Sequence, residues 1–350
     1  MGSRMDRQSG LNNPGEEGAE GGGAAGDNGF VAGKLRFRTD GTFKILQLTD
    51  LHYGESAVQK TVLAAERPDL VVFSGDMVSG WVCRPSDPRA PDCGPGWFER
   101  RWRQLIAPVH AAGLPYAVTL GNHDGEAELT RRQILDLDIR TGGVWSLTRQ
   151  GPPEASDASN YYLDVYPAMP PAHAPITCHG AGCAAAGAGD GGAAARVWLL
   201  DSGDRTCPPL MFGWGCVAED TLGWFQDVWW DAPTRGRKLE DVACSVRDTG
   251  LLGVAKHAGI SAVYSGHDHD NDYLGVKEGV RLAYGRKSGW GGYGPPQGWL
   301  RGARVIELRM GQDTAHSTQA KDMRQLICHC DEFEQALEHH RQQQDKAQLR

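Results

Sequence analysis

Short apolar runs, several of them followed directly by acidic or imidazole residues, constrain the fold of this chain more than any other feature. The runs are rich in β-branched and aromatic residues and only a few residues long. Runs of this kind predict strands that are buried on both faces of a sheet. They are Phe43–Leu48, Leu70–Phe73, Tyr116–Leu120, Val197–Leu200 and Ala262–Tyr264.

Helix-like segments separate several of these runs. Strands that alternate with helices predict a layered α/β architecture built around a sheet. Near the end of the chain, Val280–Tyr284 and Ala303–Leu308 are further candidate strands, which could be antiparallel additions to a mixed α/β sandwich. The predicted helices are Ala57–Arg67, Trp97–Ala112, Glu126–Ile139, Glu219–Trp230 and Thr249–Ala258.

Composition divides the chain into one folded domain and three segments of low complexity or high polarity. A length of 350 residues is compatible with one domain that carries insertions. Residues 1–33 are poor in aromatic and branched residues and are predicted to be disordered, and residues 34–310 form the domain. Within it, residues 180–195 are nearly all Gly and Ala and predict a loop insertion, whereas residues 311–350 are a polar, partly helical tail.

Charge and apolar content limit the classes of partner. The formal net charge of −8 argues against a broad surface for nucleic acid or an anionic membrane. No apolar run approaches the roughly 18 residues of a membrane span. The N-terminal segment also lacks the apolar stretch of a signal peptide, so we expect a cytoplasmic protein.

The nine cysteines are scattered, and their odd number favours reduced thiols over a disulfide framework. An alternative stays open if the protein is exported. Cys83 and Cys93, or Cys207 and Cys216, could then close loops.

Polar residues with metal-binding side chains follow four of the predicted strands. Such residues converge, because ligand-binding groups in open α/β sheets gather at the carboxyl ends of strands. A mixed set of His, Asp and Asn suits Zn, Mn, Fe or Ni rather than Ca. Each motif alone has an ordinary explanation, such as a turn at Gly-Asp, but all four together indicate a site. The motifs are Thr49-Asp50-Leu51-His52, Ser74-Gly75-Asp76, Gly121-Asn122-His123-Asp124 and Ser265-Gly266-His267-Asp268-His269-Asp270.

In this order, the four motifs resemble those of the calcineurin-like metallophosphoesterase superfamily. Narrower motifs are similar to one branch, the probable inactive purple acid phosphatases of plants and related fungal and algal phosphatases. The resemblance covers roughly residues 35–309, and it implies a mixed β-sheet sandwich flanked by helices, with four α/β/β/α layers. The narrower motifs lie at residues 40–47, 75–81, 200–203, 266–272 and 284–294.

The resemblance also implies a dinuclear centre with two divalent or trivalent ions, namely Fe, Mn or Zn. Its first ion would be held by Asp50, His52 and His269. The second would be held by Asn122 and His267, and Asp76 would bridge the two.

The implied function is a metal-dependent phosphatase that hydrolyses phosphate monoesters by attack of a metal-activated water or hydroxide. His123 would stabilise the phosphate and protonate the leaving group, with Asp124 as its orienting partner. Arg286 and Lys287, in the Gly-rich loop, could contact the substrate or merely lie in solvent. A phosphorylated small molecule or a phosphoprotein would be the substrate.

Two departures from the family pattern affect this expectation. Ser79 stands where purple acid phosphatases place a metal-binding Tyr, so the purple colour should be absent. The strand that brings a further His ligand to the second ion is missing around residues 228–245, which should weaken that site. The alternatives are a mis-spliced sequence of an active enzyme, or a catalytically impaired relative that binds metal or a phosphorylated partner.

Overall fold

The structure is a computed structural model, and only part of the chain is described. The predicted deletion at 228–245, residues 180–191 of the Gly/Ala insertion and nearly all of residues 1–33 lie outside the described residues, and the predictions about them stay predictions. The described residues are 30–31, 33–52, 56–83, 94–153, 157–169, 192–204, 207, 214–225, 248–294, 299–310 and 316–322.

A five-stranded mixed sheet forms the centre of the fold, in the order β12-β11-β3-β4-β5. Strands β3, β4 and β5 run parallel to one another, whereas β11 is antiparallel to β3 and β12 is antiparallel to β11. The parallel strands end at the same edge of the sheet, where the predicted site lies. The strands are β3 (Thr42–Leu48), β4 (Leu70–Ser74), β5 (Tyr116–Thr119), β11 (Gly302–Arg309) and β12 (His316–Asp322).

The second layer of strands consists of a four-stranded sheet, β1-β2-β6-β7, and a three-stranded sheet, β8-β10-β9. β10 is parallel to β8 and antiparallel to β9. Over the described residues, no strand joins β7 to β8. The strands are β1 (Phe30–Val31), β2 (Lys34–Arg36), β6 (Tyr161–Tyr166), β7 (Ala195–Leu199), β8 (Ala262–Ser265), β9 (Leu274–Lys277) and β10 (Val280–Tyr284).

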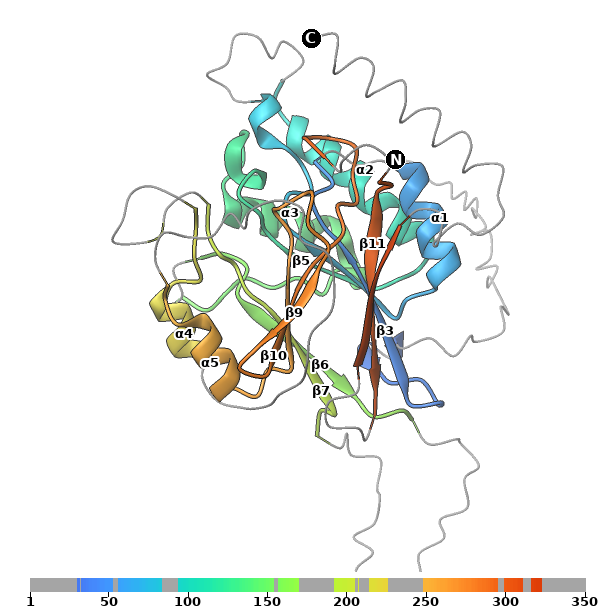
Figure 1. Cartoon of the computed structure of the whole chain (residues 1–350). Helices are drawn as coiled ribbons and strands as arrows, with labels where there is room; N and C mark the ends of the chain where they lie inside the picture. The colour runs from blue at the N-terminus through green and yellow to red at the C-terminus, as the bar shows by residue number, and fades with distance from the viewer. Residues whose placement is uncertain are drawn as a thin grey trace, which may run out of the picture.

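Helices cover both outer faces, so the architecture has the four predicted layers (Figure 1). α1, α2 and α3 pack on the five-stranded sheet, and α4 and α5 pack near β7 and β8 through Trp198 and Val263. The helices are α1 (Ser56–Glu66), α2 (Trp97–Ala111), α3 (Arg131–Gly142), α4 (Glu219–Phe225) and α5 (Leu251–His257). Short 3₁₀ turns occur at Gly80–Cys83, Asp124–Glu126 and Gly143–Trp145.

Burial on both faces of β3 confirms the strand prediction. Alternate side chains of a strand point to opposite faces of its sheet. Accordingly, Leu46 and Leu48 pack in the cluster that includes the helices, whereas Phe43 and Ile45 pack in the cluster between the two layers of strands. The sandwich therefore fixes the direction of β3, and with it the position of the residues that follow its end.

The start of α3 differs from the prediction of a helix over Glu126–Ile139. The side chain of Thr130 accepts a hydrogen bond from the backbone N–H of Gln133, and the Gln133 side chain accepts one from the Thr130 backbone. This capping box begins the helix at Arg131. Glu126 consequently lies in the preceding 3₁₀ turn, beside His123, rather than on the helix.

The prediction that the domain ends at residue 310 and is followed by a polar, partly helical tail does not hold for residues 316–322. They form β12, which pairs with β11 along most of its length. The polar composition of this segment gave no strand signal, but β11 needs a partner for the backbone groups on its outer edge. The domain therefore extends past residue 310.

Candidate metal centre

The ends of β3 and β8 bring Asp50, His52 and His269 together. One ligand atom from each of these three side chains lies within 4.8 Å of the others, and all three residues are buried. His269 Nε2 is 3.5 Å from Asp50 Oδ1, and His52 Nε2 is 3.8 Å from Asp76 Oδ2. The structure thus groups the three residues that the sequence assigned to the first ion.

Two imidazole nitrogens in this group face each other, and the protonation of the two rings decides whether a proton lies between them. Nδ1 of His269 lies 2.8 Å from the Tyr293 carbonyl oxygen, which can only accept, so Nδ1 carries a proton. Nδ1 of His52 lies 2.6 Å from Ser79 Oγ. The two Nε2 atoms are 2.9 Å apart. When His52 donates to Ser79 and His269 is neutral, both Nε2 lone pairs point into one space, an arrangement that a cation stabilises.

A second pair of donors lies next to the first group. His267 Nδ1 and Asn122 Oδ1 are 2.9 Å apart. The backbone N–H of His267 also donates to both carboxylate oxygens of Asp50, at 3.0 Å. The residues that the sequence assigned to the second ion are therefore together, and they contact a residue assigned to the first. That Asp76 bridges two ions stays a prediction.

Four of the predicted ligands have left-handed backbones, which non-glycine residues rarely adopt. The φ angles are 52° at Asp50, 50° at His52, 52° at Asp76 and 83° at His267. Only two other described non-glycine residues, Arg67 and Glu278, share this conformation. Strained backbones of this kind concentrate at functional sites, because the surrounding structure must hold them in place.

Gly121 allows the third motif to approach the second. A Cβ atom at this position would lie 2.2 Å from Asp76 Oδ1, too close for any side chain. The same Oδ1 atom of Asp76 accepts a hydrogen bond from the backbone N–H of His123, at 2.8 Å. The glycine in Gly-Asn-His-Asp is thus required by the close packing of two strand ends.

Burial sets the protonation of the cluster. It lowers the pKa of His52 to about 2 and lowers the pKa of His267, so both imidazoles are neutral, as metal ligands must be. Burial raises the pKa of Asp50, but the hydrogen bond with His269 and its charge outweigh this and lower the pKa below its ordinary value. Burial and the carboxylates of Asp124 and Asp50 raise the pKa of Asp76 well above its ordinary value.

These donors are suited to a divalent or trivalent transition metal ion. They are carboxylates, neutral imidazoles and one carboxamide, the set that Zn, Mn and Fe accept in proteins. The raised pKa of Asp76 also favours a bound metal ion, because a nearby cation would offset the repulsion among the buried carboxylates.

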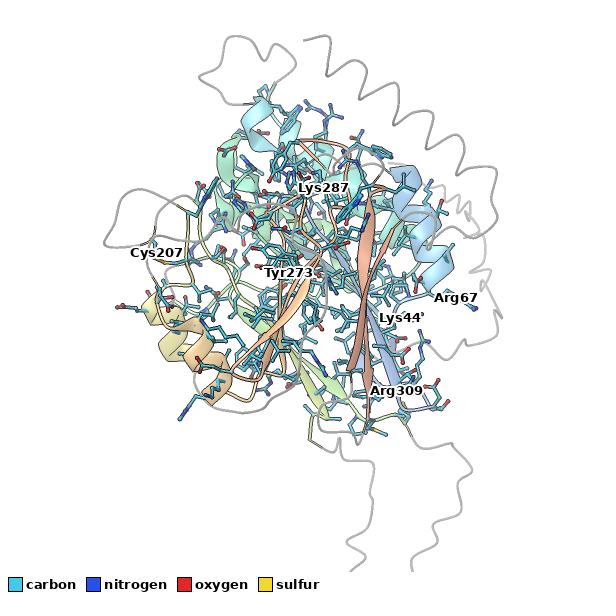
Figure 2. The ribbon with its side chains drawn as sticks, in the orientation of Figure 1. Lys44, Arg67, Cys207, Tyr273, Lys287 and Arg309 are labelled. Atoms are coloured by element: carbon cyan, nitrogen blue, oxygen red, sulfur yellow. A yellow bond between two sulfur atoms is a disulfide. The ribbon has the colours of Figure 1, made fainter. Side chains whose placement is uncertain are left out.

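Lys287 is a buried cation in the cluster, so the expectation that it could lie in solvent is wrong. Its side chain is 1% exposed, and its Nζ donates to the backbone oxygen of Asp50 at 2.9 Å. It lies among the side chains crowded near the upper end of the strands in Figure 2. Burial lowers its pKa to about 7. The sequence could not predict that Lys287 lies beside the carboxylates at the strand ends, because its pairing with Thr49 joins residues far apart in the chain.

Glu126 occupies the position that we expected Asp124 to fill. His123 Nδ1 is 2.8 Å from Glu126 Oε2, and the His123 side chain is 23% exposed, so it can be reached from solvent. Asp124 instead accepts backbone hydrogen bonds from Asp76, Val78 and Gly121. Asp124 therefore ties the strand ends together, and Glu126 orients the imidazole.

Arg286 is neither a surface residue nor free to bind a substrate. Its guanidinium forms an ion pair with Asp272, and its Nε donates to the backbone oxygen of Leu300 at 2.8 Å. The group also lies over the ring of Trp299, 4.7 Å from its centroid. Arg286 thus holds the Gly-rich loop in place, and the prediction of a substrate contact is not supported by its position.

Asp201, in the narrower motif at residues 200–203, organises the loop that carries Asn122. Its fully buried carboxylate forms an ion pair with Arg131 and accepts hydrogen bonds from the Ser159 and Gly203 backbones. Arg131 in turn donates to the backbone oxygens of Leu120 and Gly121. This motif therefore supports the backbone just before Asn122 through Arg131.

Asp157, next to this network, gives a prediction for stability against pH. Burial and the charge of Asp201 raise its pKa from 3.8 to about 7. Its proton therefore stabilises the folded state fully below pH 3.8, and this contribution is lost as the pH rises through 7. We expect Asp157→Asn to raise the free energy of unfolding at pH 8 by roughly 1 kcal/mol, screening by solvent allowed for, and to change it little near pH 4.

Urea unfolding of both proteins at the two pH values measures this difference. Arg131, Arg132 and Asp220 also face the Asp157 carboxyl and are unchanged in the variant. Asp164→Asn, on an exposed strand position paired with Arg196, is the control and should leave the pH dependence as it is. Parallel curves for wild type and Asp157→Asn would show that this carboxyl is ionised at neutral pH.

The expectation of reduced thiols is wrong for all three cysteines among the described residues. Cys207 and Cys216 form a disulfide with each other. Cys83 is disulfide-bonded as well. Sequence reasoning had left these loop closures open as an alternative, and cysteine spacing alone could not decide between them. No helix among the described residues is both long and apolar enough to cross a membrane.

Known proteins resemble this chain over most of its length. A sequence profile of the calcineurin-like phosphoesterase family matches residues 43–271, which include all four ligand motifs. Probable inactive purple acid phosphatase 28 of Arabidopsis thaliana is 28% identical over 338 residues, covering 79% of this chain and 78% of the relative. For probable inactive purple acid phosphatase 29 of the same plant, the identity is 26% over 337 residues, with 80% of each chain covered. Among solved structures, a dimetal phosphatase from Danio rerio aligns with a TM-score of 0.46 and 15% identity, over 79% of this chain and 98% of that one.

Proposed function

The chain belongs to the calcineurin-like phosphoesterase family, and from this premise we propose that it is a metal-dependent phosphatase acting on phosphate monoesters. The observation that carries the proposal is the pair of facing imidazole nitrogens of His52 and His269, 2.9 Å apart and beside the carboxylate of Asp50. In the tautomer in which His52 donates to Ser79 and His269 is neutral, the two Nε2 atoms are both acceptors, and a cation bound by both removes their mutual repulsion.

The proposed assignment of ligands follows the two donor groups. Asp50, His52 and His269 would hold one ion, Asn122 and His267 would hold the other, and Asp76 would be shared by both. When bound, such ions neutralise the phosphoryl oxygens and lower the pKa of a water that can attack phosphorus. The buried ammonium of Lys287 keeps the backbone of Asp50 in position and offsets part of the negative charge of the carboxylates.

His123 supplies the proton that the leaving group needs. Its ring centroid is 5.5 Å from that of His52, so it lies beside the first donor group. Glu126 accepts the hydrogen from Nδ1, which leaves Nε2 directed away to hold a proton for the leaving alkoxide oxygen. The glutamate also stabilises the imidazolium before transfer. Phosphorylated small molecules or phosphoproteins are the proposed substrates.

A second candidate is a catalytically impaired relative that binds metal or a phosphorylated partner. The names of the two plant relatives include the word inactive, and the predicted loss of a ligand strand at 228–245 favours the same possibility. The two candidates differ only in turnover, because both retain the donors described above.

Hydrolysis of a generic aryl phosphate distinguishes them. The protein is first stripped with a chelator and then supplied with Mn, Zn or Fe. We expect no hydrolysis without added metal and a rate that rises and saturates as metal is added. Metal binding without hydrolysis for all three metals would contradict the phosphatase proposal and support the binding protein.

The disulfide is relevant to the cellular compartment in which the protein works. Disulfides persist in oxidising compartments and are rare in the cytoplasm. The Cys207–Cys216 bond therefore favours an oxidising compartment over the cytoplasm that the cysteine count had suggested.

A further inference from the structure

Trp214 packs directly against a residue of the second donor group. Its ring centroid is 4.4 Å from that of His267, with the two rings at 72° in an edge-to-face arrangement. Aromatic contacts of this geometry are favourable beyond the area that they bury. An indole in this place limits rotation of the His267 imidazole about its side-chain bonds.

The chain directly after Trp214 is held in place by two contacts. Cys216, two residues further on, is bonded to Cys207, whose side chain is fully buried. Gly215, which lies between Trp214 and Cys216 in the sequence, donates its backbone N–H to the Asp204 backbone oxygen at 3.2 Å. A Cβ atom at Gly215 would lie 2.1 Å from the Ser202 backbone oxygen, so the two segments are in the closest possible contact. The disulfide thus fixes a turn that carries Trp214.

The segment under that turn is the same one that supports Asn122. Residues 201–204 contact Gly215, and Asp201 holds Arg131 against the backbone of Leu120 and Gly121. One short stretch of chain therefore supports both donors of the second group, one through a salt bridge and the other through the disulfide turn. Figure 2 shows Cys207 on the side of the molecule that carries α4.

His267 needs this external support because its own backbone does not favour the position. Its φ of 83° lies in the left-handed region. Its Nδ1 must face Asn122 Oδ1 for both atoms to reach one ion. Residues that only orient a metal ligand typically change metal affinity by about 10- to 100-fold when they are replaced.

We infer that Trp214 is a positioning residue for the second ion and that the Cys207–Cys216 disulfide is what keeps Trp214 in place. The inference rests on the proposed function only in that a second ion binds at Asn122 and His267. The affinity for that ion then depends on a disulfide that is distant in the sequence from both Asn122 and His267. The first group contains neither His267 nor any residue of the disulfide turn.

Calorimetric titration of the metal-stripped full chain with Zn or Mn tests the inference without relying on activity. Wild type should show a tight and a weaker class of sites. Trp214→Ala should weaken the weaker class by about 10- to 100-fold and leave the tight class unchanged, whereas Trp214→Phe should restore most of the loss. The double variant Cys207→Ser/Cys216→Ser should behave like Trp214→Ala, and it leaves no free thiol at these positions to bind the metal.

Trp198→Ala is the matched control, because Trp198 packs against the α4 and α5 cluster and should affect neither class. The tight class serves as an internal check on folding in every variant. If the cysteine variant does not fold, Trp214→Ala decides the question alone. Unchanged affinities in Trp214→Ala, or equal weakening by Trp198→Ala, would overturn the inference. A wild type that binds a single ion would overturn it too, while the aryl phosphate assay would still judge the proposed hydrolysis.

Discussion

Replacing Asp76 by asparagine is expected to lower kcat/KM on an aryl phosphate by about 10³-fold or more, because charge stabilisation by the ions contributes several kcal/mol to the transition state. The exchange preserves the shape of the side chain but removes its charge. It should also raise the melting temperature of the metal-free protein. Burial and the neighbouring carboxylates raise the pKa of Asp76, which means that its ionised form destabilises the fold at neutral pH.

Asp76→Asn should thus lower the activity but raise the melting temperature, and general damage to the fold would not produce both changes. Asp138→Asn is the matched control, because Asp138 is also fully buried but accepts hydrogen bonds from Trp102 and Tyr116, outside the centre. It should reduce the stability by about 1–3 kcal/mol and leave the activity per folded molecule intact. Hydrolysis by Asp76→Asn at the wild-type rate would refute the enzymatic proposal.

Replacing His123 by alanine should lower kcat by about 10²- to 10⁴-fold on an alkyl phosphate, whose leaving group needs a proton. With a nitrophenyl ester the loss should be much smaller, because nitrophenolate leaves without protonation. The measurement is a series of esters with leaving groups of different pKa. A loss that is the same for every ester would mean that His123 does not act as an acid.

Glu126→Gln should reproduce part of this pattern, with a loss of about tenfold on the alkyl ester, because the imidazolium is then less stabilised. Glu128→Gln is the control two residues away, where the carboxylate accepts a hydrogen bond from the Phe98 backbone at the start of α2. Asp124→Asn should instead destabilise the strand ends that it ties together. A leaving-group effect in Asp124→Asn but not in Glu126→Gln would restore the original assignment.

The sequence predicted the parts of this molecule that depend on local pattern. Apolar runs such as Leu70–Phe73 became strands buried on both faces, and the polar residues after them came together because parallel strands end at one edge. β12 was missed because its polar residues carry no apolar pattern, and its strand conformation comes from pairing with β11.

Side-chain direction was the part that could not be predicted. Asp124 directly follows His123, but the tight turn sends its carboxylate to three backbone amides. The same turn brings Glu126 back to the ring, three residues on. Likewise, Arg286 and Lys287 are neighbours in the sequence, yet only Lys287 contacts a predicted ligand, because successive residues point to opposite sides.

The left-handed backbones of the ligands have a consequence for how such a chain changes over generations. At Asp50, His52, Asp76 and His267, glycine or asparagine would relieve the conformation, so only the need for a donor keeps the present residues. A lineage released from metal binding should therefore accumulate glycine and asparagine at these four positions first, while the apolar strands stay the same. Their identities can serve as a record of whether a given descendant still uses its centre.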